Sequence, residues 1–299
     1  MATLHNLGFP RIGEGRELKF ALERYWRGEA SAAALQETAA ELRRRNRALQ
    51  AEAGLDQVPV GDFSFYDQVL DTSFLLGHIP ARFQSGAPDS ELDQYFRIAR
   101  GRAPGGEPAA AAEMTKWFDT NYHYIVPELD DATTFSLNAG QWLTQLQEAR
   151  DQGINPRPVV IGPVTYLALA KCKGETVSAL AYLDDLLPVY ARFLQELQAA
   201  GAEWVQIDEP ALALDLDADW QAAVARSYQA LGNAEQRPRI LLTTYFGPLR
   251  DNLATVAGLP VEGLHLDAVR AADEVAAVAA SWPTDRVLSL GVIDGRNVW

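Results

Sequence analysis

A short cationic segment near the start of the sequence has residue types that suit the binding of an anion. Residues 5–13 read His-Asn-Leu-Gly-Phe-Pro-Arg-Ile-Gly, and residues 16–19 read Arg-Glu-Leu-Lys. A helix that begins here would offer unpaired backbone N–H groups and a partial positive charge at its N-terminus. Arg11, Arg16 and Lys19 would add three fixed cations. The pattern predicts an anion site, although an ordinary amphipathic helix with a solvated basic face has the same pattern.

Carboxylates follow three apolar runs of the sequence and form a second group of candidates. They are Asp62, the adjacent pair Asp208 and Glu209, and Asp267. Adjacent carboxylates at the end of a strand can serve as acid and base if their environments separate their pKa values. Each of them can equally cap the following helix or pair with an arginine. Both interpretations stay open, and the pair followed by Pro210 is the strongest of the three.

The sequence carries no pattern typical of a metal or nucleophile site. A thiolate-rich zinc site needs several Cys or His ligands, whereas this chain has one cysteine, Cys172, and four widely spaced histidines. Neither a phosphate loop nor a Gly-x-Ser-x-Gly motif is present. Lys171 and Lys173 could lower the pKa of Cys172, but we interpret it as an unreactive helix residue. We therefore predict no metal ligand and no catalytic residue in this chain.

Apolar runs alternate with helical periodicity along the sequence, and this rhythm is typical of βα units. The expected strands are 4–8, 57–62, 122–128, 158–162, 203–208, 239–245, 263–267 and 287–292. The expected helices are 16–28, 31–53, 65–76, 139–152, 176–200, 218–232, 248–257 and 272–281. Eight strands with intervening helices predict an α/β fold, a (β/α)₈ TIM-type barrel, with an inserted helix pair or loop at its mouth around 77–121.

Composition limits the class of partner. The chain has 299 residues, a net charge of −14 and a hydrophobic fraction of 48%, which excludes a disordered chain and argues against a nucleic-acid partner. No signal peptide or membrane-spanning run is apparent, so we expect a cytoplasmic protein with no membrane partner. An anion would have to meet a local cluster of cations. Two such clusters are Arg11 to Lys19 and Arg97 to Arg102 followed by Lys116, while Arg43 to Arg47 is expected to be solvated surface.

Segments along almost the whole chain resemble the cobalamin-independent methionine synthase family. The resemblance rests on residues 7–13 and 16–19, and it continues through further motifs in the same order. These are Val58-Pro59-Val60-Gly61-Asp62-Phe63, Arg100-Gly101-Arg102-Ala103-Pro104, Glu113-Met114-Thr115-Lys116-Trp117-Phe118, Asn121-Tyr122-His123-Tyr124, Ile161-Gly162-Pro163-Val164-Thr165, Trp204-Val205-Gln206-Ile207-Asp208-Glu209-Pro210-Ala211-Leu212 and Gly295-Arg296-Asn297-Val298-Trp299.

The resemblance implies that residues 1–299 are the N-terminal barrel domain of a two-barrel enzyme, incomplete at its C-terminal end, with the catalytic C-terminal barrel absent from this chain. The complete enzyme would transfer a methyl group from 5-methyltetrahydropteroyltri-L-glutamate to L-homocysteine to make L-methionine, using zinc and no cobalamin. Alone, this half would be inactive. The family's folate polyglutamate contacts match Arg16, Glu17, Leu18, Lys19 and Lys116 here, with Leu18 acting through its backbone.

The family's zinc ligands have few counterparts in this chain. The family's His-x-Cys pair falls on Thr244 and Phe246, and only Asp267 remains as an acidic counterpart of the ligand Glu. Further candidate contacts are Arg11, Asp208, Glu209 and Asp267. Two alternatives stay open: an autonomous TIM-barrel hydrolase that uses Asp208, Glu209 and Asp267, and a purely structural domain.

Overall fold

A computed structural model describes residues 2–295, and the chain divides into two compact units. Unit 1 comprises Met1–Val159 and Ala170–Val177, and unit 2 comprises Val160–Leu169 and Ser178–Trp299. The segment 296–299, which ends the last family-like motif, lies outside the described residues. Within the described part, no helix is both long and apolar enough to cross a membrane.

Unit 1 is mainly helical. Its helices are α1 (Glu17–Trp26), α2 (Ala32–Glu52), α3 (Gln68–Leu75), the 3₁₀ turn η1 (Ala81–Phe83), α4 (Glu91–Arg100) and α5 (Gly140–Asp151). Its strands are β1 (Val58–Val60), β2 (Met114–Lys116), β3 (His123–Ile125), β4 (Glu128–Leu129), β6 (Lys171–Cys172) and the first residues of β5 (Pro156–Ile161). Strand β1 pairs in parallel with β5, β2 pairs antiparallel with β3, and β4 pairs in parallel with β6.

Local capping explains where two helices of unit 1 begin. The side chain of Ser31 accepts a hydrogen bond from the backbone N–H of Ala34 at the start of α2. Asp67 accepts from the N–H groups of Val69 and Leu70 at the start of α3. A capping oxygen satisfies donors that have no partner inside the helix, which typically stabilises it by about 1 kcal/mol.

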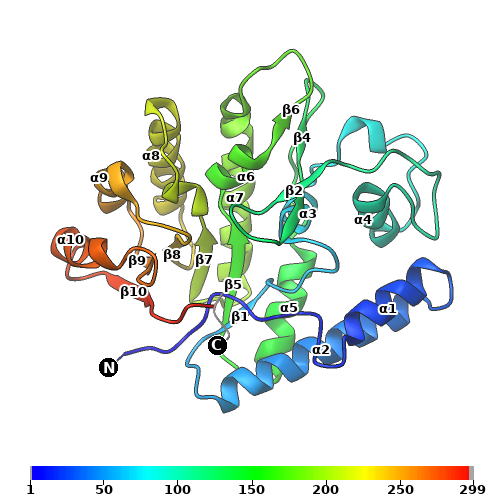
Figure 1. The fold of residues 1–299 in the computed structure, drawn as a ribbon, viewed down its shortest axis with the longest axis horizontal. Coiled ribbons are helices and arrows are strands. Elements are labelled where there is room, and N and C mark those ends of the chain that lie inside the picture. The colour runs from blue at the N-terminus through cyan, green and yellow to red at the C-terminus, as the bar shows by residue number, and fades with distance from the viewer. Residues whose placement is uncertain (1, 296–299) are drawn as a thin grey trace. The chain divides into compact units, whose positions relative to one another are not determined.

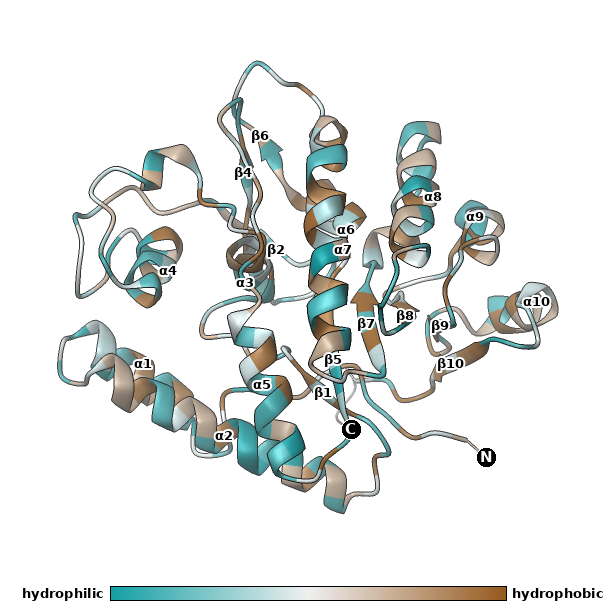
Figure 2. Cartoon of the chain, turned by 180° about the vertical axis from the view of Figure 1, so that it is seen from behind, coloured by the Kyte–Doolittle hydropathy of each residue, from teal (hydrophilic) through white to brown (hydrophobic). Residues whose placement is uncertain are grey.

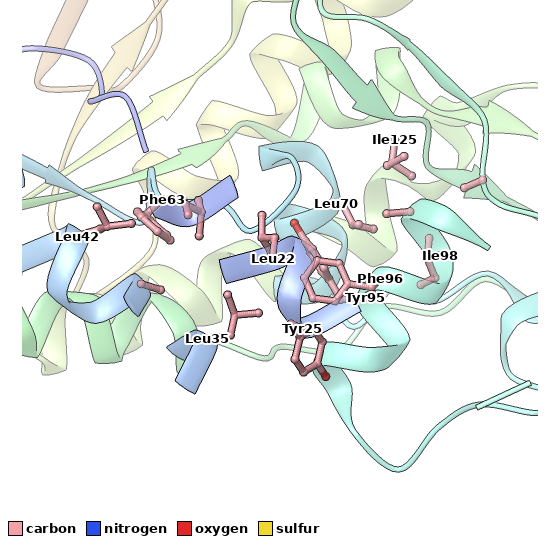
Figure 3. Packing of buried hydrophobic residues seen from close by; sticks show 14 of the residues in the cluster. Leu22, Tyr25, Leu35, Leu42, Phe63, Leu70, Tyr95, Phe96, Ile98 and Ile125 are labelled. Carbon is pink, nitrogen blue, oxygen red and sulfur yellow. The ribbon is translucent and has the colours of Figure 1, made fainter. Parts of the chain in front are cut away.

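Helices α1 and α2 lie side by side (Figure 1) and bury one apolar stripe each. Along both helices hydrophobic and hydrophilic residues alternate, whereas β7 and β10 are hydrophobic (Figure 2). The stripes meet α3 and α4 in the core of unit 1, where Leu22, Tyr25, Leu35, Tyr95 and Phe96 pack together (Figure 3). The burial of α1 against this core fixes the direction of its opposite, solvated face.

Unit 2 is built from βα repeats. It contains the last residues of β5, α6 (Pro163–Leu169), η2 (Ala179–Tyr182), α7 (Leu183–Ala199), β7 (Trp204–Asp208), η3 (Pro210–Ala213), α8 (Ala218–Gly232), β8 (Arg239–Thr243), η4 (Arg250–Asn252), α9 (Leu253–Ala257), β9 (Gly263–Asp267), η5 (Ala272–Glu274), α10 (Val275–Ser281) and β10 (Val287–Gly291). Strands β7, β8, β9 and β10 pair in parallel in chain order. Helices α8, α9 and α10 lie on one side of these strands (Figure 1).

The fold is α/β, and its main sheet has six strands in the order β1-β5-β7-β8-β9-β10, two fewer than the expected eight. Segment 4–8 forms only an isolated bridge between His5 and Gln57. Within segment 122–128, β3 pairs with β2 as a short antiparallel ribbon, and Glu128 belongs to β4, which pairs with β6. Pro127, which has no N–H to donate, lies between β3 and the two-residue strand β4, and this explains why no continuous strand forms there.

The segment 77–121, expected to hold a helix pair or loop, contains η1, α4 and β2 joined by loops. Two further details differ from expectation. Cys172 lies on β6 and not in a helix. The expected solvated cluster is half buried, because Arg43 and Arg47 are 8% and 3% exposed. Both arginines bind the carboxylate of Glu148 on α5, at 2.6 Å and 2.9 Å.

Candidate functional site

Arg16 immediately precedes α1 and carries the left-handed backbone conformation, with φ of 59°. This conformation is costly for a residue with a Cβ atom. Its side chain is exposed, and no hydrogen bond or ion pair joins its guanidinium to any residue of segment 2–295. A strained backbone that presents an unpaired cation is typical of a functional position.

The backbone donors at the start of α1 already have acceptors. The N–H of Arg16 donates to the carbonyl of Gly13, and the N–H of Leu18 donates to the carbonyl of Ile12, both at 3.1 Å. Glu17 folds back on its own N–H and binds Arg45 at 2.8 Å, and these bonds hold the pKa of its carboxyl below the usual value. These backbone N–H groups at the start of α1 are therefore occupied by acceptors of the protein itself. A ligand at this terminus would have to be contacted by side chains.

Lys19 is the second exposed cation of this face. Its Nζ lies 3.9 Å from Glu23 Oε1, one turn along α1, and both side chains are well exposed. Exposed pairs of this kind contribute little energy, so Lys19 can change partner at small cost. The side chain of Leu18 is fully buried in the core, which leaves only its backbone for any contact.

Lys116 and Arg11 lie elsewhere in unit 1. Lys116 is an exposed residue of β2, opposite His123 on β3. Arg11 is half-buried, donates from Nη2 to the carbonyl of Tyr66 at 2.5 Å, and lies over the ring of Tyr122 at 5.6 Å. No hydrogen bond or ion pair links Arg11, Lys116 and the start of α1 directly within the described chain. They share one unit, and Lys116 resembles Arg16 in having no carboxylate partner there.

Asp62 serves the N-terminal segment as an internal acceptor. Its Oδ2 accepts the N–H of Phe9 at 2.8 Å. Burial raises the pKa of its carboxyl, while the Phe9 hydrogen bond opposes this rise. Asp62 follows the end of β1 by two residues, and its contact favours the structural interpretation.

In unit 2, Glu209 directly follows β7 and is completely buried. Its Oε1 accepts from the N–H of Val164 at 3.1 Å and the hydroxyl of Tyr228 at 3.1 Å, and its Oε2 accepts from the N–H of Thr165 at 2.6 Å. Burial nevertheless raises its pKa from 4.5 to about 7, because desolvation outweighs these hydrogen bonds. The carboxylate lies so close to Gly162 that a Cβ there would approach Oε1 to 2.2 Å.

The other two acids of unit 2 also have internal partners. Asp208 accepts from Gln206 Nε2 at 2.7 Å and from the Tyr245 hydroxyl at 3.2 Å. Asp267 accepts the backbone N–H of Phe246 at 3.2 Å and those of the two residues that begin the following turn, at 3.1 Å and 3.0 Å. The contacts favour the capping and bracing interpretation of these acids over the acid and base interpretation.

The residues at the family's zinc positions do not fit a metal. Thr244 is buried, and its hydroxyl has no hydrogen-bond partner among residues 2–295. The ring of Phe246 lies 4.7 Å from that of Tyr245, measured between centroids. Neither side chain offers the thiolate or imidazole that zinc prefers. No group of three His, Cys, Asp or Glu side chains within residues 2–295 could hold a metal ion.

A buried carboxyl pair in unit 1 escaped the sequence reasoning. Burial raises the pKa of Asp67 from 3.8 to about 7 and that of Asp71 from 3.8 to about 6. The Tyr95 hydroxyl donates to Asp71 at 2.7 Å, and the N–H of Ile125 donates to Asp67 at 3.0 Å. The capping position of Asp67 is visible in the sequence, but the network depends on contacts between distant segments.

Comparison with known proteins identifies the family. The profile of the cobalamin-independent synthase N-terminal domain matches residues 3–299. A relative from Photorhabdus laumondii subsp. laumondii, 5-methyltetrahydropteroyltriglutamate–homocysteine methyltransferase, is 55% identical over 100% of this chain, which spans 39% of that relative.

Solved structures show a similar fold at low sequence identity. A Listeria monocytogenes protein, provisionally assigned as a vitamin-B12-independent methionine synthase, gives a TM-score of 0.62 at 14% identity, over 99% of this chain and 80% of that chain. A B12-independent methionine synthase from Shewanella sp. W3-18-1 gives 0.52 at 13% identity, over 88% of this chain and 82% of that chain. These likenesses concern the fold alone. The profile match, which covers nearly every residue, carries the identification: the chain belongs to the family of cobalamin-independent synthase N-terminal domains.

Proposed function

We propose that this chain is the N-terminal half of a methyltransferase that moves a methyl group from 5-methyltetrahydropteroyltri-L-glutamate to L-homocysteine. In this proposal the half holds the polyglutamate tail of the folate and supports a catalytic C-terminal barrel. The observation that carries it is the pair of exposed cations Arg16, which immediately precedes α1, and Lys19 in the first turn of α1, in a protein with a net charge of −14.

The arrangement of the two cations suits a carboxylate chain. Arg16 has no internal partner within the described chain, and Lys19 has only a weak one in Glu23. Charge-assisted hydrogen bonds from Arg and Lys to carboxylates are shorter and roughly twice as strong as neutral ones. Glu17 would act by keeping α1 capped, and Lys116 would supply a further cation from β2.

The chemistry of the reaction belongs to the other half in this proposal. Zinc would activate the homocysteine thiol there, because the residues of this chain at the corresponding positions do not fit a metal. The six strands seen here would form part of a TIM-type barrel. The alternative of an autonomous hydrolase is not favoured, since Asp208, Glu209 and Asp267 are all bound by internal donors.

A calorimetric titration of this chain with mono- and triglutamyl 5-methyltetrahydrofolate tests the proposal. We expect tighter binding of the triglutamate, and a loss of about three- to tenfold in its affinity on Arg16→Ala or Lys19→Ala, because each variant removes an exposed ionic contact. Arg24→Ala is the matched control, since Arg24 is an exposed cation of α1 with no side-chain hydrogen bond to another described residue.

Two outcomes would contradict the proposal. Equal affinity for the two folates would show that the tail is not recognised by this half. Methyl transfer by the chain alone, or stoichiometric zinc binding, would show that the assignment of the chemistry to another domain is wrong.

A further inference from the structure

A second cationic position lies at the opposite end of α1. Arg100, the last residue of α4, places its guanidinium 3.8 Å from the ring centroid of Trp26, the last residue of α1. A guanidinium stacked on an aromatic ring keeps its N–H groups in the plane of the stack, where they can form two parallel hydrogen bonds with a carboxylate.

Arg100 has no carboxylate acceptor among residues 2–295. None of the hydrogen bonds and ion pairs of residues 2–295 involves its guanidinium, although the side chain is only partly exposed. Its pKa is lowered, first by burial and then by the positive charge of Arg102. Two like charges held near each other without a counterion are unfavourable, and a bound anion would relieve this repulsion.

The two cationic positions lie at the two ends of α1. Lys19, Glu23 and Trp26 are three or four residues apart along this helix, which places them in one row, and Arg16 immediately precedes the helix. The ten residues of α1 give it a length of about 15 Å. An extended α-linked residue spans about 3.5 Å and a γ-linked glutamate, with two more backbone carbons, about 6 Å, so three glutamates match the length of the helix.

We propose that Arg100, placed by Trp26 and assisted by Arg102, binds a carboxylate of an outer glutamate on the folate tail whose inner carboxylates contact Arg16 and Lys19. This inference rests on the proposed function. In this arrangement the tail lies along α1. The first glutamate contacts the start of the helix, and the third reaches its end.

Glu23 opposes this arrangement and therefore provides a test. Its carboxylate lies in the same row, between the two cationic positions, and its only ion pair within the described chain is the 3.9 Å contact with Lys19. A polyanionic tail passing along the row would be repelled by Glu23. Replacing it by Gln would remove the repulsion and free Lys19.

The experiment is a titration of the same chain with folates that carry one, two and three glutamates. Arg100→Ala is expected to lower the triglutamate affinity about tenfold, because one good charge-assisted contact usually contributes that much. The same variant should leave the monoglutamate affinity unchanged. Arg100→Lys should retain part of the gain, and Glu23→Gln should raise triglutamate affinity. Arg24→Ala, which changes the net charge equally, should do neither.

The outcomes separate this inference from the proposed function. Suppose that Arg100→Ala keeps the full increase in affinity from the third glutamate while Arg16→Ala and Lys19→Ala weaken binding. The role of Arg100 is then wrong, and the proposed binding of the tail at Arg16 and Lys19 stands. If the wild-type chain binds all three folates equally, or binds none, both proposals fail. A uniform loss for all three folates on Arg100→Ala would assign Arg100 to the fold instead.

Discussion

The charged residue before α1 and the one directly after β7 differ in exposure and in the number of internal partners. Before α1, Arg16 has no partner for its charge within residues 2–295 and has a strained backbone. Directly after β7, Glu209 is completely buried and receives three hydrogen bonds, two of them from backbone N–H groups. Both positions belong to motifs that the family resemblance singled out, so membership of a motif does not distinguish a ligand contact from an internal brace. The two positions differ in the supply of internal partners, and our proposal uses this difference to separate a ligand contact from an internal brace.

Residues of the types found in active sites can be present in a fold while their hydrogen-bonding capacity is used by internal partners. Glu209 and Asp208 retain the adjacent carboxylates that could act as acid and base, but the protein's own donors occupy them. An occupied acceptor must lose these bonds before it can serve a substrate, which is costly in a buried position. Arg16 needs no such exchange.

The largest effect is expected from Gly162→Ala. Because a Cβ at this position would lie 2.2 Å from Glu209 Oε1 and 2.7 Å from its Cγ, the buried side chain would have to move. We expect a loss of about 2 to 4 kcal/mol in the free energy of unfolding, measured by urea denaturation.

Gly258→Ala is the matched control, since a Cβ there would meet only ordinary contacts, the nearest at 3.6 Å. Equal stability of Gly162→Ala and the wild type would show that Glu209 is loosely held. In that case the contrast with α1 would disappear.

A smaller effect is expected in the pH dependence of stability. The pKa of Glu209 is raised from 4.5 to about 7 in the folded state, so the folded protein binds this proton more tightly than the unfolded chain. Its contribution to stability is therefore highest below pH 4.5 and falls as the pH rises through 7. Glu209→Gln, which carries no charge, should lack this fall, and the difference from the wild type should change by up to about 3 kcal/mol between pH 4 and 8.

The readout is the difference between the two proteins, because Asp67 and Asp71 also have raised pKa values and contribute a fall of the same sign to both. Parallel stability curves for wild type and variant would show that the carboxyl of Glu209 is not desolvated as its contacts indicate.

The smallest effect concerns the strained cation on α1. Arg16→Gly should be about 1 kcal/mol more stable than Arg16→Ala in thermal or urea unfolding, because φ of 59° suits glycine and penalises any residue with a Cβ. Both variants should lose triglutamate affinity to the same extent. A more stable alanine variant would mean that the left-handed conformation is not kept, and the comparison would lose its structural basis.

The sequence predicted the strands of unit 2 well and those of unit 1 less well. Segments 203–208 and 263–267 are apolar runs buried on both faces, and they correspond closely to β7 (Trp204–Asp208) and β9 (Gly263–Asp267). Segment 4–8 has a similar pattern, but its single bridge through His5 is all that forms. Whether a short apolar run joins a sheet depends on partners that are distant in sequence.

Some features of the candidate site could likewise be predicted from the sequence, and others could not. Cations at a helix start can be read from Arg16 and Lys19, since the helix pattern is local. The occupation of the terminus by Glu17, and of Glu209 by Val164 and Thr165, depends on side-chain direction and burial. Arg100 on Trp26 joins the ends of two helices that are about 70 residues apart, so its position required the folded structure.

The ion pairs between α2 and α5 have a consequence for synthesis. Arg43 and its partner Glu148 are separated by 105 residues. At about 5 to 20 residues per second, the ribosome supplies the glutamate roughly 5 to 20 seconds after the arginine. During that interval Arg43 and Arg47 have no Glu148 to pair with, so we expect their guanidinium groups to stay hydrated until α5 is synthesised. Burial of these two charges is therefore expected to be a late step of folding, because it needs a carboxylate that follows about 100 residues later in the chain.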